Sequence, residues 1–201
     1  MEFLKLKKNL SERGYLVSEF ETGSEAVRYL DQNIDHRSVG IGGSMTVEQL
    51  GLYDALKSHN QVFWHYRIPE GKTDPEIRQA ASLTDIYISS VNGLAETGEI
   101  INIDGKGNRV AAMLYGHKKL YLLVGENKIS EDYDRALYRA RNVAAPKNAA
   151  RLQVRTPCAI KADRCYDCRS PQRICRALSV LWDAPSDSDI EVVLIHEPLG
   201  F

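Results

Sequence analysis

The chain has 201 residues, of which 43% are hydrophobic and 26% are charged, as is ordinary for a globular protein. The length suits a single domain over residues 1–201. Lysine and arginine total 26 against 27 aspartates and glutamates, so the net charge of −1 argues against binding to nucleic acid or an anionic membrane. No apolar run approaches the roughly 20 residues of a membrane span. The first residues lack the apolar core of a signal peptide, and we expect a cytoplasmic protein.

Predicted helices and strands alternate over the first ninety or so residues. Amphipathic patterns predict helices at 2–13, 23–34, 46–56 and 74–83. Ser24 is the expected N-cap of the second helix, and Asp74, followed by Pro75, is that of the fourth. Short runs rich in β-branched and aromatic residues predict strands at 15–20, 37–41, 61–66 and 85–89.

The pattern changes in the second half of the chain. Residues 99–103 and 109–114 are predicted to form a β-hairpin around a turn at 104–108. A buried strand follows at 119–125, then a helix at 130–144 that Pro146 should end, and a last strand at 189–195. Because strands that alternate with helices build βαβ units, we expect a three-layer α/β/α domain with a mainly parallel sheet and an added β-hairpin.

Three polar loops follow predicted strands and together predict one ligand pocket, since such sheets bind ligands at the carboxyl ends of their strands. In GIGGSMT (40–46), glycines allow close approach and the helix start attracts an anion, although a tight turn with a Ser or Thr cap is the alternative. The glycine spacing is neither a Walker A nor a dinucleotide pattern, so we expect no nucleotide cofactor. The candidate ligand-binding residues are Gly42, Gly43, Ser44, Thr46, Asn92, Gly93, Thr97, Gly125, Asn127 and Lys128.

The four cysteines of the chain lie close together in the sequence, in a segment at 156–177. They are Cys158, Cys165, Cys168 and Cys175. The central Cys-x-x-Cys is a common chelating arrangement, and four thiolates suit either zinc or a [4Fe–4S] cluster. A redox-active dithiol and free thiols are the alternatives. Nearby arginines favour the thiolate form in either functional interpretation.

Several stretches around these loops resemble the LUD domain family, which is named for lactate utilisation. The matching stretches are GIGGSMTVEQLGLYDAL, the run from ISSVNGLAETGEI to LLVGENKI, RARNVAAPKNAARL, TPC, CYDC and VVLIHEPLGF. The resemblance implies a Rossmann-like fold of the NagB/RpiA/CoA-transferase group, in which a similar glycine-rich loop holds phosphate. Isomerases of that group use a carboxylate base, for which Glu96 is the candidate here and Glu126 the reserve.

The resemblance leaves two hypotheses about function. The first is an enzyme, or an enzyme subunit, that acts on a small anionic metabolite such as an organic acid, a sugar phosphate or a CoA-like molecule. The second is a non-catalytic sensor or accessory subunit with a structural metal site. Some family members belong to a lactate-oxidising system whose partners carry iron–sulfur clusters, so other lactate-utilisation proteins are expected partners. The sequence does not determine the oligomeric state, for which a homodimer is one expectation.

Overall fold

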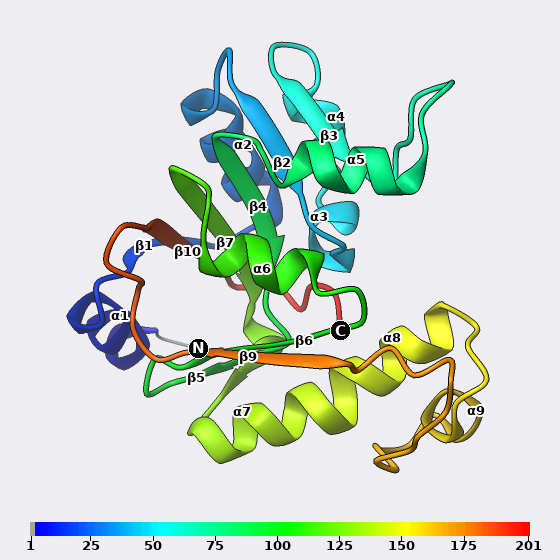
Figure 1. Cartoon of the computed structure of the whole chain (residues 1–201). Helices are drawn as coiled ribbons and strands as arrows, with labels where there is room; N and C mark the ends of the chain where they lie inside the picture. The colour runs from blue at the N-terminus through cyan, green and yellow to red at the C-terminus, as the bar shows by residue number, and fades with distance from the viewer. Residues whose placement is uncertain (1–2) are drawn as a thin grey trace.

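The computed structural model describes residues 3–201 and contains two β-sheets (Figure 1). The central sheet has six strands in the order β1-β10-β7-β4-β2-β3, and every neighbouring pair is parallel. The second sheet has four strands in the order β8-β5-β6-β9. It lies below the central sheet in Figure 1, with the continuous helical segment of α7 and α8 beneath it.

The strands of each sheet and the helices have the following bounds. The central strands are β1 (Leu16–Phe20), β2 (Ser38–Ile41), β3 (Gln61–Trp64), β4 (Ile86–Ser90), β7 (Lys119–Gly125) and β10 (Asp189–Ile195). The second sheet comprises β5 (Gly93–Ala95), β6 (Ile100–Asp104), β8 (Ile129–Ser130) and β9 (Ala177–Leu181). The helices are α1 (Leu4–Glu12), α2 (Gly23–Asn33), α3 (Met45–Gln49), α4 (Leu52–Leu56), α5 (Asp74–Ala81), α6 (Asn108–Leu114), η1 (Glu126–Lys128), α7 (Tyr133–Arg139), η2 (Ala140–Ala144), α8 (Ala145–Arg151) and α9 (Pro157–Lys161).

Helices cover both faces of the central sheet, which confirms the predicted three-layer α/β/α arrangement. Successive residues of β10 enter different cores, as the two-residue period of a strand requires. Val192 and Leu194 pack in a core with α1 and α6, whereas Val193 and Ile195 pack in a second core with α2 and α4. No helix within residues 3–201 has the length and apolar character needed to cross a membrane.

The predicted hairpin at 99–114 is wrong in its second half, because residues 108–114 form α6. Strand β6 pairs antiparallel with β5 and with β9, neither of which the sequence pattern predicts. The Asp104 carboxylate accepts the backbone N–H groups of Lys106, Gly107, Arg109 and Val110. Gly107 takes a φ of 85°, which glycine adopts readily. Together these features turn the chain into a helix whose alanine-rich sequence supports it.

Two predicted helix starts and one predicted helix also need correction. Thr22 and Thr73, and not Ser24 and Asp74, are the N-caps of α2 and α5. In each case the glutamate three residues later accepts the backbone N–H of the threonine, as in a capping box. The helix predicted at 46–56 is divided into α3 and α4 by Gly51, whose φ is 64°.

Pro146 does not end the helix that begins at Tyr133. The helix continues through the π-helical segment η2 into α8, which ends at Arg151. A proline lacks an N–H group and its ring crowds the carbonyl one turn earlier. The wider π turn immediately before Pro146 relieves that crowding, and such bulges are a recognised way to carry a helix past an irregularity. The continuation matters because α8 forms part of the cavity described below.

Gly40 in β2 is a position where we expect a side chain to be destabilising. A Cβ atom there would lie 2.3 Å from the Ala81 carbonyl oxygen and 2.8 Å from Thr84 Oγ1. Gly40→Ala should therefore lower the free energy of unfolding by roughly 1–3 kcal/mol, the usual cost of overpacking. Urea denaturation followed by circular dichroism measures this loss.

Gly71 provides the matched control. Its φ is 76°, and an added Cβ would meet no atom within 4 Å. Gly71→Asn should have little effect, because asparagine tolerates the left-handed region. Equal losses in the two variants would show that close approach at Gly40 is unimportant.

Candidate functional site

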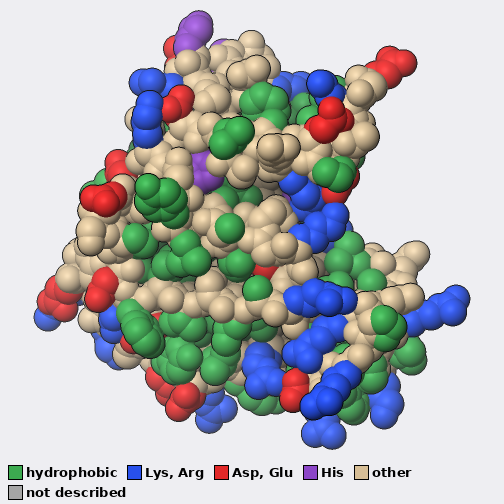
Figure 2. Space-filling model, viewed as in Figure 1, with side chains coloured by type: hydrophobic (Ala, Val, Ile, Leu, Met, Phe, Trp, Pro, Cys, Tyr) green, Lys and Arg blue, Asp and Glu red, His purple; other side chains and the backbone are tan. Residues whose placement is uncertain are grey.

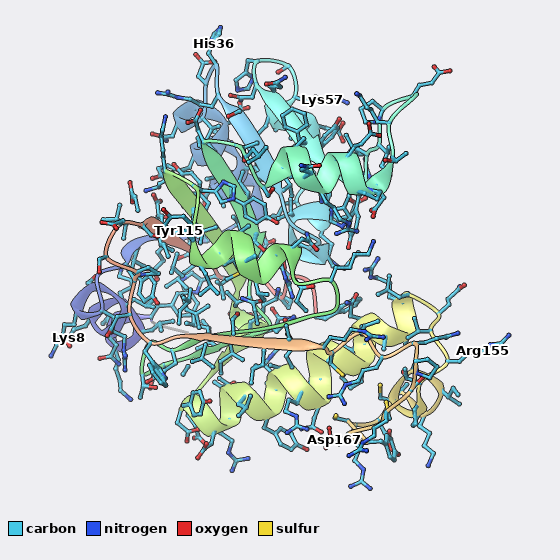
Figure 3. All side chains as sticks on the ribbon, viewed as in Figure 1. Lys8, His36, Lys57, Tyr115, Arg155 and Asp167 are labelled. Atoms are coloured by element: carbon cyan, nitrogen blue, oxygen red, sulfur yellow. The ribbon has the colours of Figure 1, made fainter. Side chains whose placement is uncertain are left out.

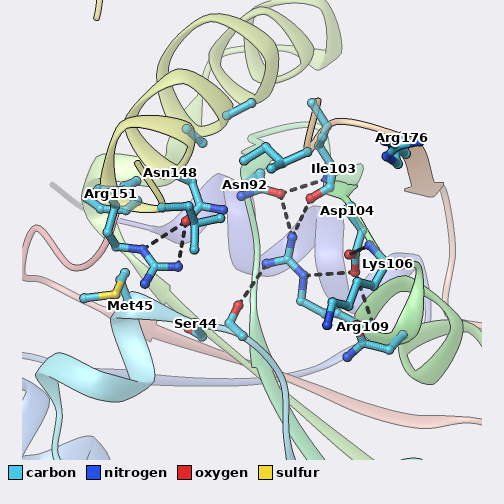
Figure 4. A pocket seen from close by; sticks show the side chains of 18 of the residues that line it. Ser44, Met45, Asn92, Ile103, Asp104, Lys106, Arg109, Asn148, Arg151 and Arg176 are labelled. Atoms are coloured by element: carbon cyan, nitrogen blue, oxygen red, sulfur yellow. Dashed lines mark hydrogen bonds and ion pairs between the residues drawn. The ribbon is translucent and has the colours of Figure 1, made fainter. Parts of the chain in front are cut away.

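A cavity of about 540 Å³ lies between the carboxyl ends of the central strands and the second sheet with α8 (Figure 4). Its lining includes Gly43, Ser44, Met45, His65, Tyr66, Arg78, Ser90, Val91, Asn92, Ile103, Asp104, Lys106, Asn108, Arg109, Lys128, Asn148, Arg151, Arg173, Ile174, Arg176 and Phe201. The three loops singled out in the sequence therefore meet at one place. Figure 2 shows that lysine and arginine side chains gather on the right of the molecule, around the recess beside this region.

The guanidinium of Arg109 joins the loops that surround the cavity (Figure 4). It donates hydrogen bonds to Asn92 Oδ1 at 3.0 Å, to the Ile103 carbonyl oxygen at 2.6 Å and to the Gly43 carbonyl oxygen at 3.5 Å. Its Nε also lies 3.8 Å from Asp104 Oδ2. Burial by itself would raise the pKa of Asp104, but Arg109 and the backbone N–H groups hold this pKa below its usual range.

Positive side chains dominate the cavity lining. Among the lining residues in the described part of the chain, Asp104 is the only acidic one. Arg78 and Lys106 share Asp74, which lies just outside the lining, at 2.9 and 2.8 Å. Arg78, followed by Lys106, keeps the pKa of Asp74 well below its usual range.

Two further arginines face the cavity without a carboxylate partner among residues 3–201. Arg151 donates to Asn148 Oδ1 at 2.9 Å and to the Tyr66 hydroxyl at 3.1 Å, and its guanidinium lies over the Tyr66 ring. Arg176 donates to the backbone oxygens of Arg173 and Pro171. Neutral acceptors orient these guanidinium groups without cancelling their charge, so both remain able to attract an anion.

Lys128 presents a buried amine to the cavity. Its Nζ lies 2.7 Å from both Thr46 Oγ1 and Ser90 Oγ. The two hydroxyls donate elsewhere, to the carbonyl oxygens of Leu199 and Leu123, so each can accept from Nζ. Burial, followed by the charges of Arg139 and Arg109, lowers the pKa of Lys128 well below its usual value. A neutral amine can donate two hydrogens to these hydroxyls and keeps its lone pair free.

The glycine-rich loop after β2 does not act through a helix N-terminus. Ser44 caps α3 by accepting the Val47 backbone N–H at 3.2 Å, and α3 has only five residues. The loop is therefore a tight turn with a serine cap, which the sequence analysis gave as the alternative to an anion-binding helix start. Gly43 and Ser44 nevertheless line the cavity. The attraction for an anion therefore comes mainly from arginine and lysine side chains, and less from backbone amides.

Several predicted ligand-binding residues lie behind the cavity wall. Thr46 holds Lys128, as described above, and Gly42 packs where a Cβ would lie 3.0 Å from Ser89 Oγ. Asn127 Oδ1 accepts the Leu199 backbone N–H at 3.0 Å, and Gly125 leaves room for the same segment. Gly93 lies in β5, where a Cβ would approach the Ala136 carbonyl oxygen to 2.5 Å. These residues position the lining without belonging to it.

Other predicted residues lie in a different part of the fold. Glu96 forms an ion pair with Lys5 of α1 at 2.6 Å, and the Thr97 carbonyl oxygen accepts from Arg13 at 2.7 Å. Glu126, the reserve carboxylate, lies in η1 and donates its backbone N–H to Glu197. None of the three lines the cavity. The acidic residue that does, Asp104, was predicted only as part of a turn.

Sequence reasoning missed most of the cationic lining. Arg78, Lys106, Arg151 and Arg176 come from separate elements, and no local spacing connects them. His65 was also missed. Burial, followed by the neighbouring Arg78, lowers the pKa of His65 to about 4, so this imidazole is neutral at pH 7. The only available signal was a surplus of arginines in the stretch 135–176, where the continuation of the helix past Pro146 was not predicted.

The four cysteines line a second cavity of about 360 Å³. All four are half-buried and free of disulfide bonds. Figure 3 shows Asp167, which lies within the cysteine segment, at the end of the molecule that carries α9. Within residues 3–201, no three His, Cys, Asp or Glu side chains approach closely enough to hold a single metal ion. The zinc or [4Fe–4S] cofactor expected from the sequence thus stays a prediction.

Comparisons with known proteins support the fold and identify the family. A search of curated proteins found no match. Among solved structures, a DUF162 family protein from Deinococcus radiodurans gives a TM-score of 0.52 at 11% identity, covering 95% of this chain and 94% of that chain. This likeness concerns the fold alone. The sequence pattern of the LUD domain matches residues 4–195. The chain therefore belongs to the LUD domain family, the lactate-utilisation family that its loops resemble.

Proposed function

We propose that this LUD domain protein binds a small anionic metabolite in the cavity between the central sheet and α8. The observation that carries the proposal is the charge of the lining, where several arginines and Lys106 face one carboxylate, that of Asp104, which is itself paired with Arg109. Guanidinium groups that meet no carboxylate among residues 3–201, such as those of Arg151 and Arg176, are well suited to carboxylate and phosphate oxygens, because their planar donors bind two oxygens at once.

The cavity volume favours a ligand larger than lactate. Lactate has few non-hydrogen atoms and fills on the order of 100 Å³, if each takes a little less than the roughly 30 Å³ of a water molecule. The cavity has about 540 Å³, which lies within the range typical of sites for larger metabolites. Among organic acids, sugar phosphates and CoA-like molecules, the size and charge of the site favour the phosphorylated ligands.

The buried amine of Lys128 favours an enzyme over a binding protein. A neutral lysine is the form that accepts a proton or attacks a carbonyl carbon. Two hydroxyls hold this amine at the cavity wall, and burial favours its neutral form. A component of lactate oxidation, working with other lactate-utilisation proteins, is the biological setting that the family suggests.

The second candidate function is a sensor or accessory subunit, and one observation favours it. Asp104 accepts several backbone N–H groups and faces Arg109, so it is engaged in structure and is a poor general base. Glu96 lies outside the cavity. Turnover by the isolated chain would exclude this alternative, whereas ligand binding without turnover would favour it.

Ligand binding tests the proposal directly. Thermal shift assays with lactate, ribose 5-phosphate and acetyl-CoA at millimolar concentration should raise the melting temperature with at least one phosphorylated ligand, because a ligand that binds the folded state stabilises it. No shift with any of these compounds would argue against an anion site.

Arg151 and Arg176 should carry much of the affinity. Arg151→Ala or Arg176→Ala should weaken binding of the ligand identified above by about 10–100-fold, since a charge-assisted hydrogen bond contributes roughly 1.5–3 kcal/mol. Isothermal titration calorimetry measures this change. Arg155→Ala is the matched control, because Arg155 is exposed and does not line the cavity. If all three variants bound the ligand equally weakly, the loss of affinity would reflect the net charge of the protein and not contacts in the cavity.

Lys128 should make stability depend on pH in a defined direction. Its pKa is lowered in the folded chain, so the unfolded chain binds the additional proton between the folded value and the usual 10.5. This contribution to stability is complete above pH 10.5 and is lost as the pH falls towards the folded value. Lys128→Met, which removes the titrating group, should therefore gain stability relative to wild type at pH 7, and the gain should shrink towards pH 10.

Urea denaturation at several pH values between 7 and 10 measures this difference. Lys147→Met is the control, because Lys147 is exposed on α8 and its substitution should produce no such pH-dependent difference. A difference between Lys128→Met and wild type that stays constant with pH would mean that Lys128 remains charged in the folded protein.

A further inference from the structure

We propose that the four cysteines bind a [4Fe–4S] cluster in the second cavity, and that this cluster supports one wall of the anion cavity. Cys158, Cys165, Cys168 and Cys175 come from α9 and from the irregular segment that follows it, and all four side chains line the same cavity of about 360 Å³. A donor set of four thiols without histidine or carboxylate is typical of zinc and iron–sulfur sites.

Among residues 3–201 the four thiols surround one cavity and do not converge on a single point. In a tetrahedral Cys₄ zinc site the sulfur atoms lie about 4 Å apart, since each Zn–S bond is about 2.3 Å. Within residues 3–201 no three ligand side chains are gathered closely enough for one ion. A cubane of four irons and four sulfides is larger than an ion and keeps its thiolates further apart. Thiols distributed around one cavity suit the larger group.

The polar groups around the sulfur atoms also suit a cluster. The Asp167 backbone N–H donates to Cys165 Sγ at 3.4 Å, within the Cys-x-x-Cys turn. Arg173 Nε lies 3.2 Å from Cys175 Sγ, and its Nη1 donates to the Cys168 carbonyl oxygen at 2.8 Å. Hydrogen bonds to sulfur stabilise iron–sulfur clusters and adjust their reduction potentials. A cluster with four thiolates is net negative, and Arg141 and Arg173, which line this cavity, would balance that charge.

The backbone of the Cys-x-x-Cys turn is already shaped for chelation. Asp167 takes a φ of 44°, in the left-handed region that aspartate adopts more readily than most residues. This conformation reverses the chain between Cys165 and Cys168, so that both side chains face the same cavity. The Cys165 backbone N–H donates to Asn142 Oδ1 at 3.1 Å, which anchors the turn to the helical segment η2.

The two cavities share a wall. Ile103, Ala145, Arg173, Ile174 and Arg176 line both of them. Most of the cysteine segment lacks regular secondary structure, so a bound cluster would fix its conformation, and with it the side of the anion cavity formed by residues 171–176. We therefore expect cluster loading to change affinity for an anion in the first cavity. This last step rests on the proposed anion site, whereas the cluster itself does not.

Metal and sulfide analysis of the full chain tests the cluster. The protein should be purified without oxygen; one sample is then offered Fe²⁺ and Fe³⁺ in equal amounts together with sulfide, and a second sample is offered Zn²⁺ alone. We expect iron and acid-labile sulfide in equal amounts, about four of each per chain, and absorbance near 400 nm. One zinc per chain without sulfide would overturn the proposal, and so would four titratable thiols with no bound metal.

Serine variants locate the ligands. Cys168→Ser and Cys175→Ser should each lose most of the iron and sulfide, whereas Ile160→Ala, on the exposed side of α9, should keep both. If a serine variant fails to fold, the metal content of the wild-type chain still decides the question. Retention of the full iron and sulfide content in both serine variants would overturn the assignment.

The effect on the anion site is measured separately. Calorimetry with ribose 5-phosphate on loaded and metal-free protein should give dissociation constants that differ by about tenfold or more, with tighter binding in the loaded form. Equal dissociation constants would show that the cluster does not affect the anion cavity, but they would not contradict the cluster itself. No binding in either form would count against the proposed anion site and not against the cluster.

Discussion

The guanidinium of Arg109 is the contact on which the anion cavity depends. It bonds to the loop after β2 through Gly43, to the loop after β4 through Asn92, and to the end of β6 through Ile103. These segments belong to two different sheets, and Arg109 connects them at the cavity wall. Its partner Asp104 is slightly more buried, so loss of the guanidinium would leave a poorly solvated carboxylate that only backbone N–H groups stabilise.

The second constraint is the mutual repulsion of the cations around the cavity. Arg78 and Lys106 are balanced by Asp74, and Arg173 lies 3.5 Å from Asp167, so these charges are offset outside the cavity. Lys128 avoids the problem because burial favours its neutral form. Arg151 and Arg176 have no such balance among residues 3–201, and a bound anion would relieve their repulsion. Because the fold balances the other cations around the cavity, Arg151 and Arg176 can keep the positive charge that favours binding of an anion.

The architecture was predictable where apolar periodicity repeats along the chain. Every strand of the central sheet coincides with a predicted run, because buried parallel strands need continuous β-branched and aliphatic residues. The second sheet was not predictable, since β5 and β8 are too short to show a period and β9 has a mixed pattern. The hairpin error at 104–114 arose because Asp104 and Gly107 start either a turn or a helix.

The site was predictable only in outline. Loops at strand ends identified Gly43, Ser44, Asn92 and Lys128, because the parallel topology brings those ends to one edge. The side chains that give the cavity its charge come from α5, α6, α8 and the cysteine segment. Arg151 faces the cavity only because the helix continues past Pro146 through a π turn, which no local rule predicts. Such positions follow from tertiary packing, which a single sequence does not reveal.

The place of β10 in the sheet has a consequence for how the protein folds during synthesis. β10 follows every other described strand in the sequence, yet it is an internal strand of the central sheet, between the edge strand β1 and β7. While the ribosome is still producing the preceding residues, β1 has no neighbour and one side of β7 remains open. Exposed strand edges of this kind invite pairing with other chains. Chaperone protection of the nascent chain therefore matters most in the interval before residues 189–195 emerge.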